Sequence, residues 1–231
     1  MAFWEWMPNS RRYRLTTEGA EKLGQRAGTF VSQSKMVGLR DELIASQKNR
    51  VNDLARRLSS GDIRLERWQL EMREIVKENF INQYMLARGG RNAMTPSDWG
   101  RLGNMIRNQY SFLDSFAADI ASGRYGEAGV AARARMYVEA SGQAFERANA
   151  VTRGMPDLPQ YPGDGRTQCL ANCKCRWRIV EREAQWECHW VLSPAEHCPD
   201  CLANAVRWNP LVISKERVPF RSVALKELAA L

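Results

Sequence analysis

All six cysteines and both histidines of the chain lie in one stretch, Cys169–Cys201. The longer part of the chain before this stretch has neither residue type. Cysteine and histidine are the side chains that bind borderline metal ions such as zinc, so their confinement indicates a metal-binding segment. The sequence therefore predicts two kinds of structure, one formed by this stretch and another by the residues that precede it.

The cysteines are expected to be reduced thiols. The N-terminus, MAFWEWMPNSRRYRL, lacks a basic region followed by an apolar one, so no secretory signal is predicted. No run of about 18 apolar residues occurs, so no membrane-spanning helix is predicted either. Disulfides are rare in the cytosol, and clustered cysteines in such a chain are therefore interpreted first as metal ligands.

The stretch has the pattern of a β-hairpin. Apolar and polar residues alternate over 175–180 and again over 186–192, as in two half-buried strands. Residues 183–184 fit the turn between them. Residues 193–196, Ser-Pro-Ala-Glu, predict the start of a short helix. This helix is expected to carry His197, Cys198 and Cys201.

The hairpin brings two groups of cysteines together. Cys198 and Cys201 form a Cys-x-x-Cys pair, and a second group precedes the first strand. Because the second strand returns the chain to the start of the first, the two groups are expected to meet and supply the four ligands of a tetrahedral zinc ion. The sequence thus predicts a structural Zn²⁺ site with five candidate ligands: Cys169, Cys173, Cys175, Cys198 and Cys201.

Five candidates exceed four coordination positions. Cys173 and Cys175 together with the Cys-x-x-Cys pair form one possible set, and Cys169 in place of Cys173 forms another. A reduced, metal-free cluster of core cysteines is the alternative without zinc. A cysteine-only site is closed and suits a structural role, since catalytic zinc sites keep an open position.

The remaining cysteine and the histidines are expected to have other roles. Cys188 shares a strand face with Trp186 and Trp190, so it is predicted to be a small buried hydrophobic residue. His189 points to the opposite face and is expected at the surface. His197 is a poorer ligand candidate, because the adjacent Cys198 would point elsewhere.

The preceding part of the chain has the apolar periodicity of about four helices. They are predicted over about 35–58, 62–88, 95–123 and 127–151. The third has a strong start signal, because Thr95 can cap, Pro96 suits the first turn and Asp98 suits the positive end of the helix dipole. The expected fold is therefore mainly α, an N-terminal helical domain followed by a small zinc-stapled β-hairpin module, in which the ion cross-links the two ends of the hairpin. The predicted divisions are an N-terminal arm at 1–34, the helical domain at 35–152, a Pro/Gly linker at 153–168, the cysteine-rich module at 169–213 and a C-terminal tail at 214–231.

The arm begins with an aromatic cluster followed by arginines. Phe3, Trp4 and Trp6 either form a strand folded back on the chain's own domain, which we favour, or a docking arm for a partner. The run Arg11, Arg12 and Arg14 fits contact with phosphates but is more typical of a solvated surface.

The formal net charge of +8 fits polyanionic neighbours such as nucleic acid and, equally, a soluble protein with many surface arginines. Arg176 and Arg178 alternate with Trp177 in the first strand, so they could grip a nucleic-acid strand. The alternation favours the other interpretation, in which the tryptophans face the core and the arginines face solvent.

Nothing in the helical region predicts catalysis. It has no paired catalytic carboxylates, no Gly-rich phosphate loop and no Ser/His/Asp arrangement. A zinc hydrolase or nuclease that uses His189 or His197 is the weakest alternative, because neither has a partnered general base nearby in the sequence. We therefore expect no enzymatic activity.

Two blocks of the sequence resemble those of tailed-phage head morphogenesis proteins, also called minor head or minor capsid proteins, of phages and prophages. One is residues 89–140, with its segments RNQYSFLDSFAADI and RARMYVEA. The other combines PGDGRTQCLANCKCRWRI with WVLSPAEHCPDCLANAVRWNP. Together the blocks cover over half of the chain.

The resemblance implies a structural role in the head, near the portal and in few copies. It implies the portal and/or major capsid protein as partners, an oligomeric state in the virion, and a location in the virion or, during assembly, in the host cytoplasm. In similar proteins the cysteine block is thought to hold a metal, which carries over to the same five cysteines and leaves Cys188 outside the pattern. Relatives with added domains have roles that do not transfer to this chain.

Overall fold

The structure, a computed structural model, describes residues 4–10, 12–170, 173, 175–194 and 196–215. Its N-terminal part contains β1 (Trp4–Met7), β2 (Arg12–Leu15), α1 (Thr17–Leu23) and β3 (Phe30–Val31). The long helices are α2 (Gln33–Ser59), α3 (Leu65–Arg88), α4 (Pro96–Ala121), α5 (Glu127–Ala140) and α6 (Gly142–Thr152), with a short 3-10 turn, η1 (Arg91–Ala93), before α4. The C-terminal part contains β4 (Arg176–Glu181), β5 (Gln185–Val191), α7 (Pro199–Arg207) and β6 (Leu211–Ser214).

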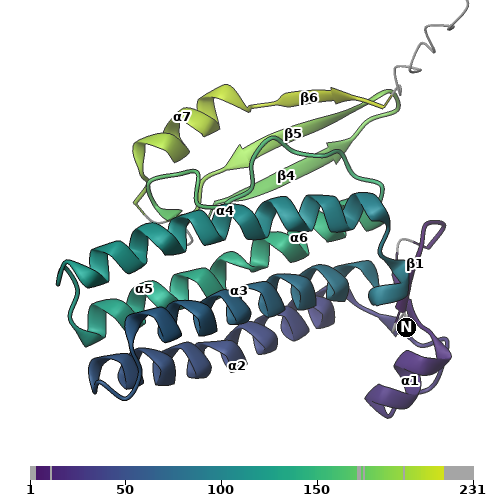
Figure 1. Cartoon of the computed structure of the whole chain (residues 1–231). Helices are drawn as coiled ribbons and strands as arrows, with labels where there is room; N and C mark the ends of the chain where they lie inside the picture. Colours follow the sequence, from purple (N-terminus) through teal and green to yellow (C-terminus); the bar gives the residue numbers. More distant parts are fainter. Residues whose placement is uncertain (1–3, 11, 171–172, 174, 195, 216–231) are drawn as a thin grey trace, which may run out of the picture.

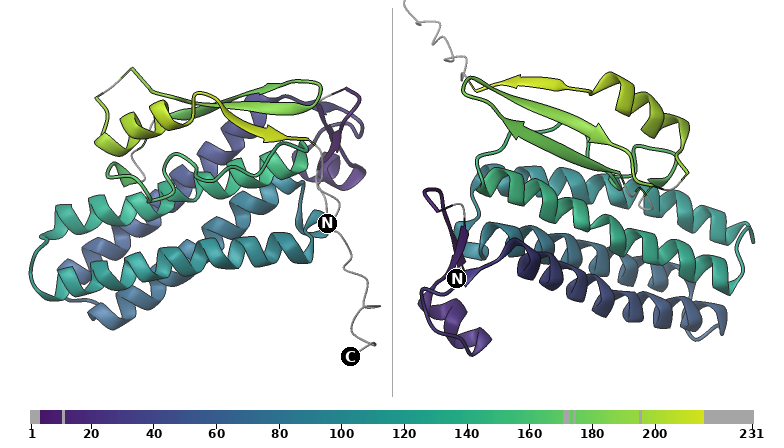
Figure 2. Two further views of the ribbon diagram at one scale, coloured as in Figure 1. Left: turned by 90° about the horizontal axis from the view of Figure 1, so that it is seen from above. Right: turned by 180° about the vertical axis from the view of Figure 1, so that it is seen from behind.

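A mainly helical region is thus followed by a small antiparallel sheet with a cysteine group, which confirms the predicted fold class (Figure 1). The sheet lies along one side of the bundle, and the N-terminal strands pack at one end of it (Figure 2). None of the described helices combines the length and the apolar composition that a membrane span requires. The predicted divisions of the chain stay predictions, and Phe3, Arg11 and residues 216–231 lie outside the described residues.

The start of α4 follows the sequence signals. Thr95 is the N-cap, and its hydroxyl accepts a hydrogen bond from the backbone N–H of Asp98. The Asp98 side chain accepts one in return from the backbone N–H of Thr95, which completes a capping box around Pro96. The predicted helix start is therefore confirmed.

One predicted helix divides into two. The sequence predicted a single helix over 127–151, whereas the structure has α5 and α6 with a break at Ser141. The fully buried Ser141 hydroxyl donates to the carbonyl of Val138 and accepts from the Asn79 amide of α3, at 2.8 Å. This local hydrogen bonding competes with a continuous helix, so the helical region has five long helices instead of about four.

The N-terminal strands are part of the main core. Trp4, Tyr13 and Leu15 are buried against the bundle, which agrees with the interpretation of a strand folded back on its own domain. Gly89, which ends α3 at a φ of 91°, lies so close to this strand that a Cβ would meet the carbonyl oxygen of Trp4 at 2.1 Å. Glycine is therefore required where β1 crosses the end of α3.

The C-terminal sheet has the order β4-β5-β6, all antiparallel. β4 and β5 are the predicted hairpin; β6 was not predicted as a strand. Trp177 pairs with Trp190 on the inner face, where both pack with Trp208 at ring-centroid distances of 5.3 to 5.7 Å. Arg176 and Arg178 are exposed, as the alternation predicted.

The short helix begins later than predicted. It starts at Pro199, with Cys198 as its N-cap, and not at the predicted residues 193, 194 or 196; Ala195 lies outside the described residues. Proline at position 199 suits the first turn of a helix and keeps the residue before it extended, which Cys198 is, with φ −71° and ψ 156°.

Candidate metal site

Three cysteines converge between the loop before β4 and the first turn of α7. The sulfur atoms of Cys169, Cys173 and Cys201 all lie within 4.8 Å of one another, a group that could hold a metal ion. The Sγ of Cys201 is 3.6 Å from that of Cys169 and 3.5 Å from that of Cys173. Sulfur ligands about 2.3 Å from zinc are roughly 3.8 Å apart in a tetrahedron, so the spacing is close to that of bound ligands.

A fourth thiol adjoins this group. The Sγ of Cys198 is 3.5 Å from that of Cys169. Cys198 is the N-cap of α7 and Cys201 lies in its first turn, so the start of one helix presents both sulfurs of the Cys-x-x-Cys pair. Four thiols thus come from two chain segments, the arrangement expected for a structural zinc site.

The two remaining cysteines and the two histidines lie outside the group of three. The Sγ of the buried Cys175 is 4.0 Å from the Nδ1 of His197 instead of being in the group of three. Cys188 is fully buried on the inner face of the sheet. His189 lies on the outer face, where its Nδ1 is 2.7 Å from the Oδ1 of Asn209. The structure therefore brings Cys169 and Cys173 together at Cys201 and pairs Cys175 with His197.

The loop that carries Cys169 is shaped by a left-handed residue. Leu170 has a φ of 49°, and its backbone N–H donates to the Thr167 carbonyl at 2.8 Å. The loop is tied to α7 by Asp200, whose carboxylate accepts from the backbone N–H of Gln168 at 2.8 Å. The sequence analysis did not single out Asp200; its signal was an acidic residue in a helix first turn, between two cysteines.

The thiols differ in how easily they ionise. Burial raises the pKa of Cys173 to about 11; burial also raises the pKa of Cys201, together with hydrogen bonds in which its neutral thiol donates to neighbouring sulfurs. Burial also opposes ionisation of Cys198, but hydrogen bonds from the backbone of Cys201 and Cys169 outweigh it and lower its pKa to about 7. A cluster in which several thiols resist ionisation needs a nearby cation to become a set of thiolates.

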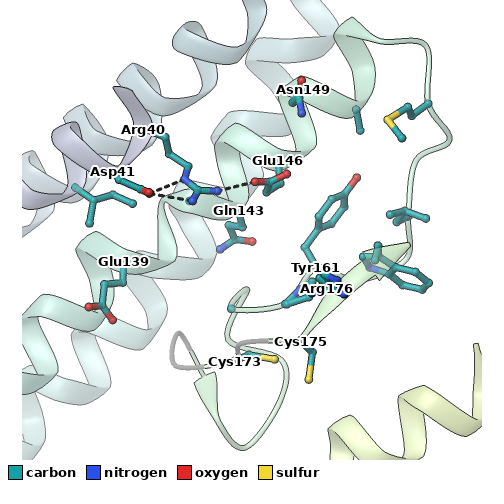
Figure 3. A pocket seen from close by; sticks show the side chains of 18 of the residues that line it. Arg40, Asp41, Glu139, Gln143, Glu146, Asn149, Tyr161, Cys173, Cys175 and Arg176 are labelled. Carbon is teal, nitrogen blue, oxygen red and sulfur yellow. Dashed lines mark hydrogen bonds and ion pairs between the residues drawn. The ribbon is translucent and has the colours of Figure 1, made fainter. Parts of the chain in front are cut away.

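A cavity of about 590 Å³ reaches the cysteine group from the side of the helical bundle (Figure 3). Cys173 and Cys175 lie on its rim. Arg40 crosses it with hydrogen bonds to Asp41 and Glu146. The cavity is lined by side chains of both charge signs, from elements that include α2, α6 and β4. Of the three clustered thiols, Cys173 is the one that lines this cavity.

The apolar core around the thiols is small. Its buried members are Cys175, Trp190, Cys201 and Trp208, and the main core of the bundle is a separate cluster that ends at Ala148. A module of this size buries little apolar surface, so cross-linking through a metal ion would contribute much of its stability.

Comparisons with known proteins do not assign the chain to a family. No protein-family model matches the chain, and neither a curated protein nor a solved structure is significantly similar to it. What stands is a mainly helical protein with a possible cysteine metal site in a small β module.

Proposed function

We propose that the chain is a structural minor head protein of a tailed phage or prophage, which acts in head assembly near the portal and contains a structural zinc ion. The observation that carries this proposal is the convergence of Cys169, Cys173 and Cys201, which lie in the cysteine block that resembles head morphogenesis proteins. The block of residues 89–140, which carries the other half of the resemblance, spans α4 and α5 in the bundle. Portal and/or major capsid protein are the proposed partners, in the virion and in the host cytoplasm during assembly.

The proposed zinc ligands are Cys169, Cys173, Cys198 and Cys201. Their spacings of 3.5 to 3.6 Å, where sulfur atoms meet, support this set over one that includes Cys175. Among the described residues, the group that can hold a metal consists of cysteines alone. Four thiolates leave no position for substrate, so the ion would stabilise the fold and the protein would have no catalytic activity.

Metal content tests the zinc site. We expect elemental analysis of freshly reduced protein to find one zinc per chain, and Cys201→Ala to lose it. Cys188→Ala is the matched control, because Cys188 is equally buried but lies away from the group. Wild-type protein without metal, or loss of metal in both variants, would contradict the proposed site.

Association with a head component tests the assembly role. Co-expressed with the portal protein and, separately, with the major capsid protein of the same phage or prophage, the chain is expected to co-elute with at least one of them in size-exclusion chromatography. A zinc-loaded chain that co-elutes with neither protein would contradict the assembly role and would not affect the proposed zinc site.

Nucleic-acid binding by the zinc module is the second candidate function. It is favoured by the exposure of Arg176 and Arg178 on the outer face of the sheet, next to His189. DNA binding through these residues would weaken steeply as the salt concentration rises. In the double variant Arg176→Gln, Arg178→Gln, the slope of log K against log salt concentration would fall by the share of about two phosphate contacts. Unchanged DNA affinity of the double variant across a salt series would exclude this surface.

A further inference from the structure

A second hollow lies at the end of the bundle where the N-terminal strands pack, far from the cysteines along the chain. Its volume is about 400 Å³, and Ser32, the N-cap of α2, lies at its edge. Residues of all three N-terminal strands and the residue after α6 line it. Figure 2 shows these strands at one end of the bundle. The lining residues are Trp6, Arg12, Tyr13, Phe30, Val31, Ser32 and Arg153.

Two arginines in this hollow lie over aromatic rings. The Cζ of Arg12 is 5.7 Å from the ring centroid of Phe30, and the Cζ of Arg153 is 5.4 Å from that of Trp6. A cation–π contact uses the charge of a guanidinium group and none of its N–H groups as a hydrogen-bond donor to a carboxylate, so these donors stay available for an anion. Among the residues that the structure describes, neither arginine has a carboxylate within ion-pair distance, whereas Arg14 on the same strand is paired with Glu5.

The walls of the hollow are apolar and held in place. Tyr13 is buried, its hydroxyl is bonded to the side chain of Asn149, and its ring lies 5.0 Å from that of Trp6. Phe30 is 49% exposed, although it belongs to a strand of the sheet. A fixed concave site with aromatic walls and two available guanidinium groups is complementary to an acidic side chain with an apolar neighbour.

We propose that this hollow binds an acidic peptide segment of a partner protein, with a carboxylate held by Arg12 and Arg153 and an apolar side chain against Phe30 and Val31. A peptide fits better than nucleic acid. Tight binding of a phosphate backbone needs a long series of cations, and base stacking needs free ring faces, whereas the hollow has two cations and each of them covers one face of a ring. The proposal does not depend on the zinc site or on the assembly role.

Titration calorimetry with the full chain tests the proposal. The probe is a blocked peptide of alternating glutamate and leucine, and the control probe has glutamine in place of every glutamate. We expect the acidic peptide to bind, the glutamine peptide not to bind, and Arg12→Gln and Arg153→Gln each to weaken binding about tenfold, as expected for a hydrogen bond to a charged group.

Arg14→Gln is the matched control, because this arginine lies on the same strand but outside the hollow and already has a carboxylate partner. It is expected to bind the acidic peptide as the wild type does. Thermal unfolding of each variant separates lost binding from lost folding; Arg12 is exposed, so its variant is expected to fold normally.

Three results would overturn the proposal: no binding of the acidic peptide at millimolar concentration, equal binding of the glutamine peptide, or equal losses in all three arginine variants. A short DNA duplex and a single strand form the second arm. If Arg12→Gln and Arg153→Gln weaken DNA binding and leave peptide binding unchanged, the hollow binds phosphate and the peptide proposal fails.

Discussion

Asp98 is a buried charged residue at the junction of α3 and α4. Its carboxylate is 1% exposed, caps α4, and accepts hydrogen bonds from the Tyr84 hydroxyl at 2.9 Å and from Arg88 at 3.1 Å. Burial disfavours the charged form, but the hydrogen bonds from Thr95 and Tyr84 and the charge of Arg88 outweigh it and lower the pKa of Asp98. The hydrogen bonds and the Arg88 charge at the junction of α3 and α4 thus stabilise the ionised form of the Asp98 carboxyl group.

We expect Asp98→Asn to destabilise the folded protein by about 3 kcal/mol at neutral pH, because it leaves Arg88 without its buried charge partner. A carboxyl group whose pKa is lower in the folded than in the unfolded chain stabilises the fold above the unfolded value, about 4, and loses this effect as the pH falls through the folded value. Denaturant unfolding at several pH values should therefore show the two proteins converging in acid.

Asp119→Asn is the control for this prediction, since Asp119 forms an ion pair with the exposed Arg124 at the end of α4. Exposed pairs contribute little, so this variant should unfold like the wild type. A gap between Asp98→Asn and wild type that stays constant down to low pH would show that the lost group acted through shape and not through charge.

The two residues Cys169 and Cys175 distinguish the possible ligand sets. Because the sulfur of Cys169 lies by those of Cys198 and Cys201 while that of Cys175 faces His197, Cys169→Ala should lose the zinc and Cys175→Ala should keep one equivalent. Elemental analysis of the two variants side by side makes the comparison. The reverse result would restore the set of Cys173, Cys175, Cys198 and Cys201.

At the scale of elements, the sequence predicted those helix positions and helix starts that depend on neighbouring residues in the chain. Apolar periodicity located α2 to α4, and the residues Thr95, Pro96 and Asp98 predicted the start of α4 within one residue. The break between α5 and α6 was not predictable, because it depends on Asn79 of another helix. β6 was missed because its four residues are too few to show a period and need β5 to pair with.

The same limit applies to the candidate site. Spacing alone predicted that the cysteines before the hairpin meet the Cys-x-x-Cys pair, because a hairpin must return. Which of Cys169, Cys173 and Cys175 takes part depends on the left-handed turn at Leu170 and on the tie from Gln168 to Asp200. Neither feature leaves a periodic trace in the sequence.

The junction of α5 and α6 gives a prediction at this scale. Asn79→Ala would leave the buried Ser141 with fewer partners and remove two hydrogen bonds, to Ser141 and to the Val138 carbonyl. We expect a loss of about 2 kcal/mol in the free energy of unfolding. The exposed Asn104→Ala on α4 should change it by less than about 0.5 kcal/mol. Equal effects in denaturant titrations would mean that the junction is not held by Asn79.

At the scale of the whole molecule, the bundle and the β module have separate cores. The largest apolar cluster includes residues from Trp4 to Ala148, while the clusters of the module draw on residues from Leu158 onward. The linker residues Leu158 and Tyr161 pack under the sheet with Cys188, and Trp177 donates to the Gln160 carbonyl at 2.8 Å. The linker thus contributes to the core of the module, and Arg147 of α6 also holds it, with its Cζ 4.5 Å from the ring centroid of Tyr161.

Removal of metal should therefore act on one part only. We expect a strong chelator to abolish the near-ultraviolet circular dichroism of the cluster of Trp177, Trp190 and Trp208, while the helical signal is largely retained. The midpoint of the main thermal transition should shift by no more than a few degrees. Cooperative loss of both signals on chelation would show instead that the two cores fold as one unit.

The reactivity of Cys188 toward an alkylating reagent depends on whether the sheet of the β module is folded. Five of the six thiols belong to the cysteine cluster around Cys201 or adjoin it. Cys188 is instead covered by the packing of the sheet, and burial raises its pKa to about 11. An alkylating reagent therefore encounters two independent kinds of protection in the β module. If the proposed ion is bound, its release is expected to make the clustered thiols reactive first, and modification of Cys188 is expected only later, when the strands separate.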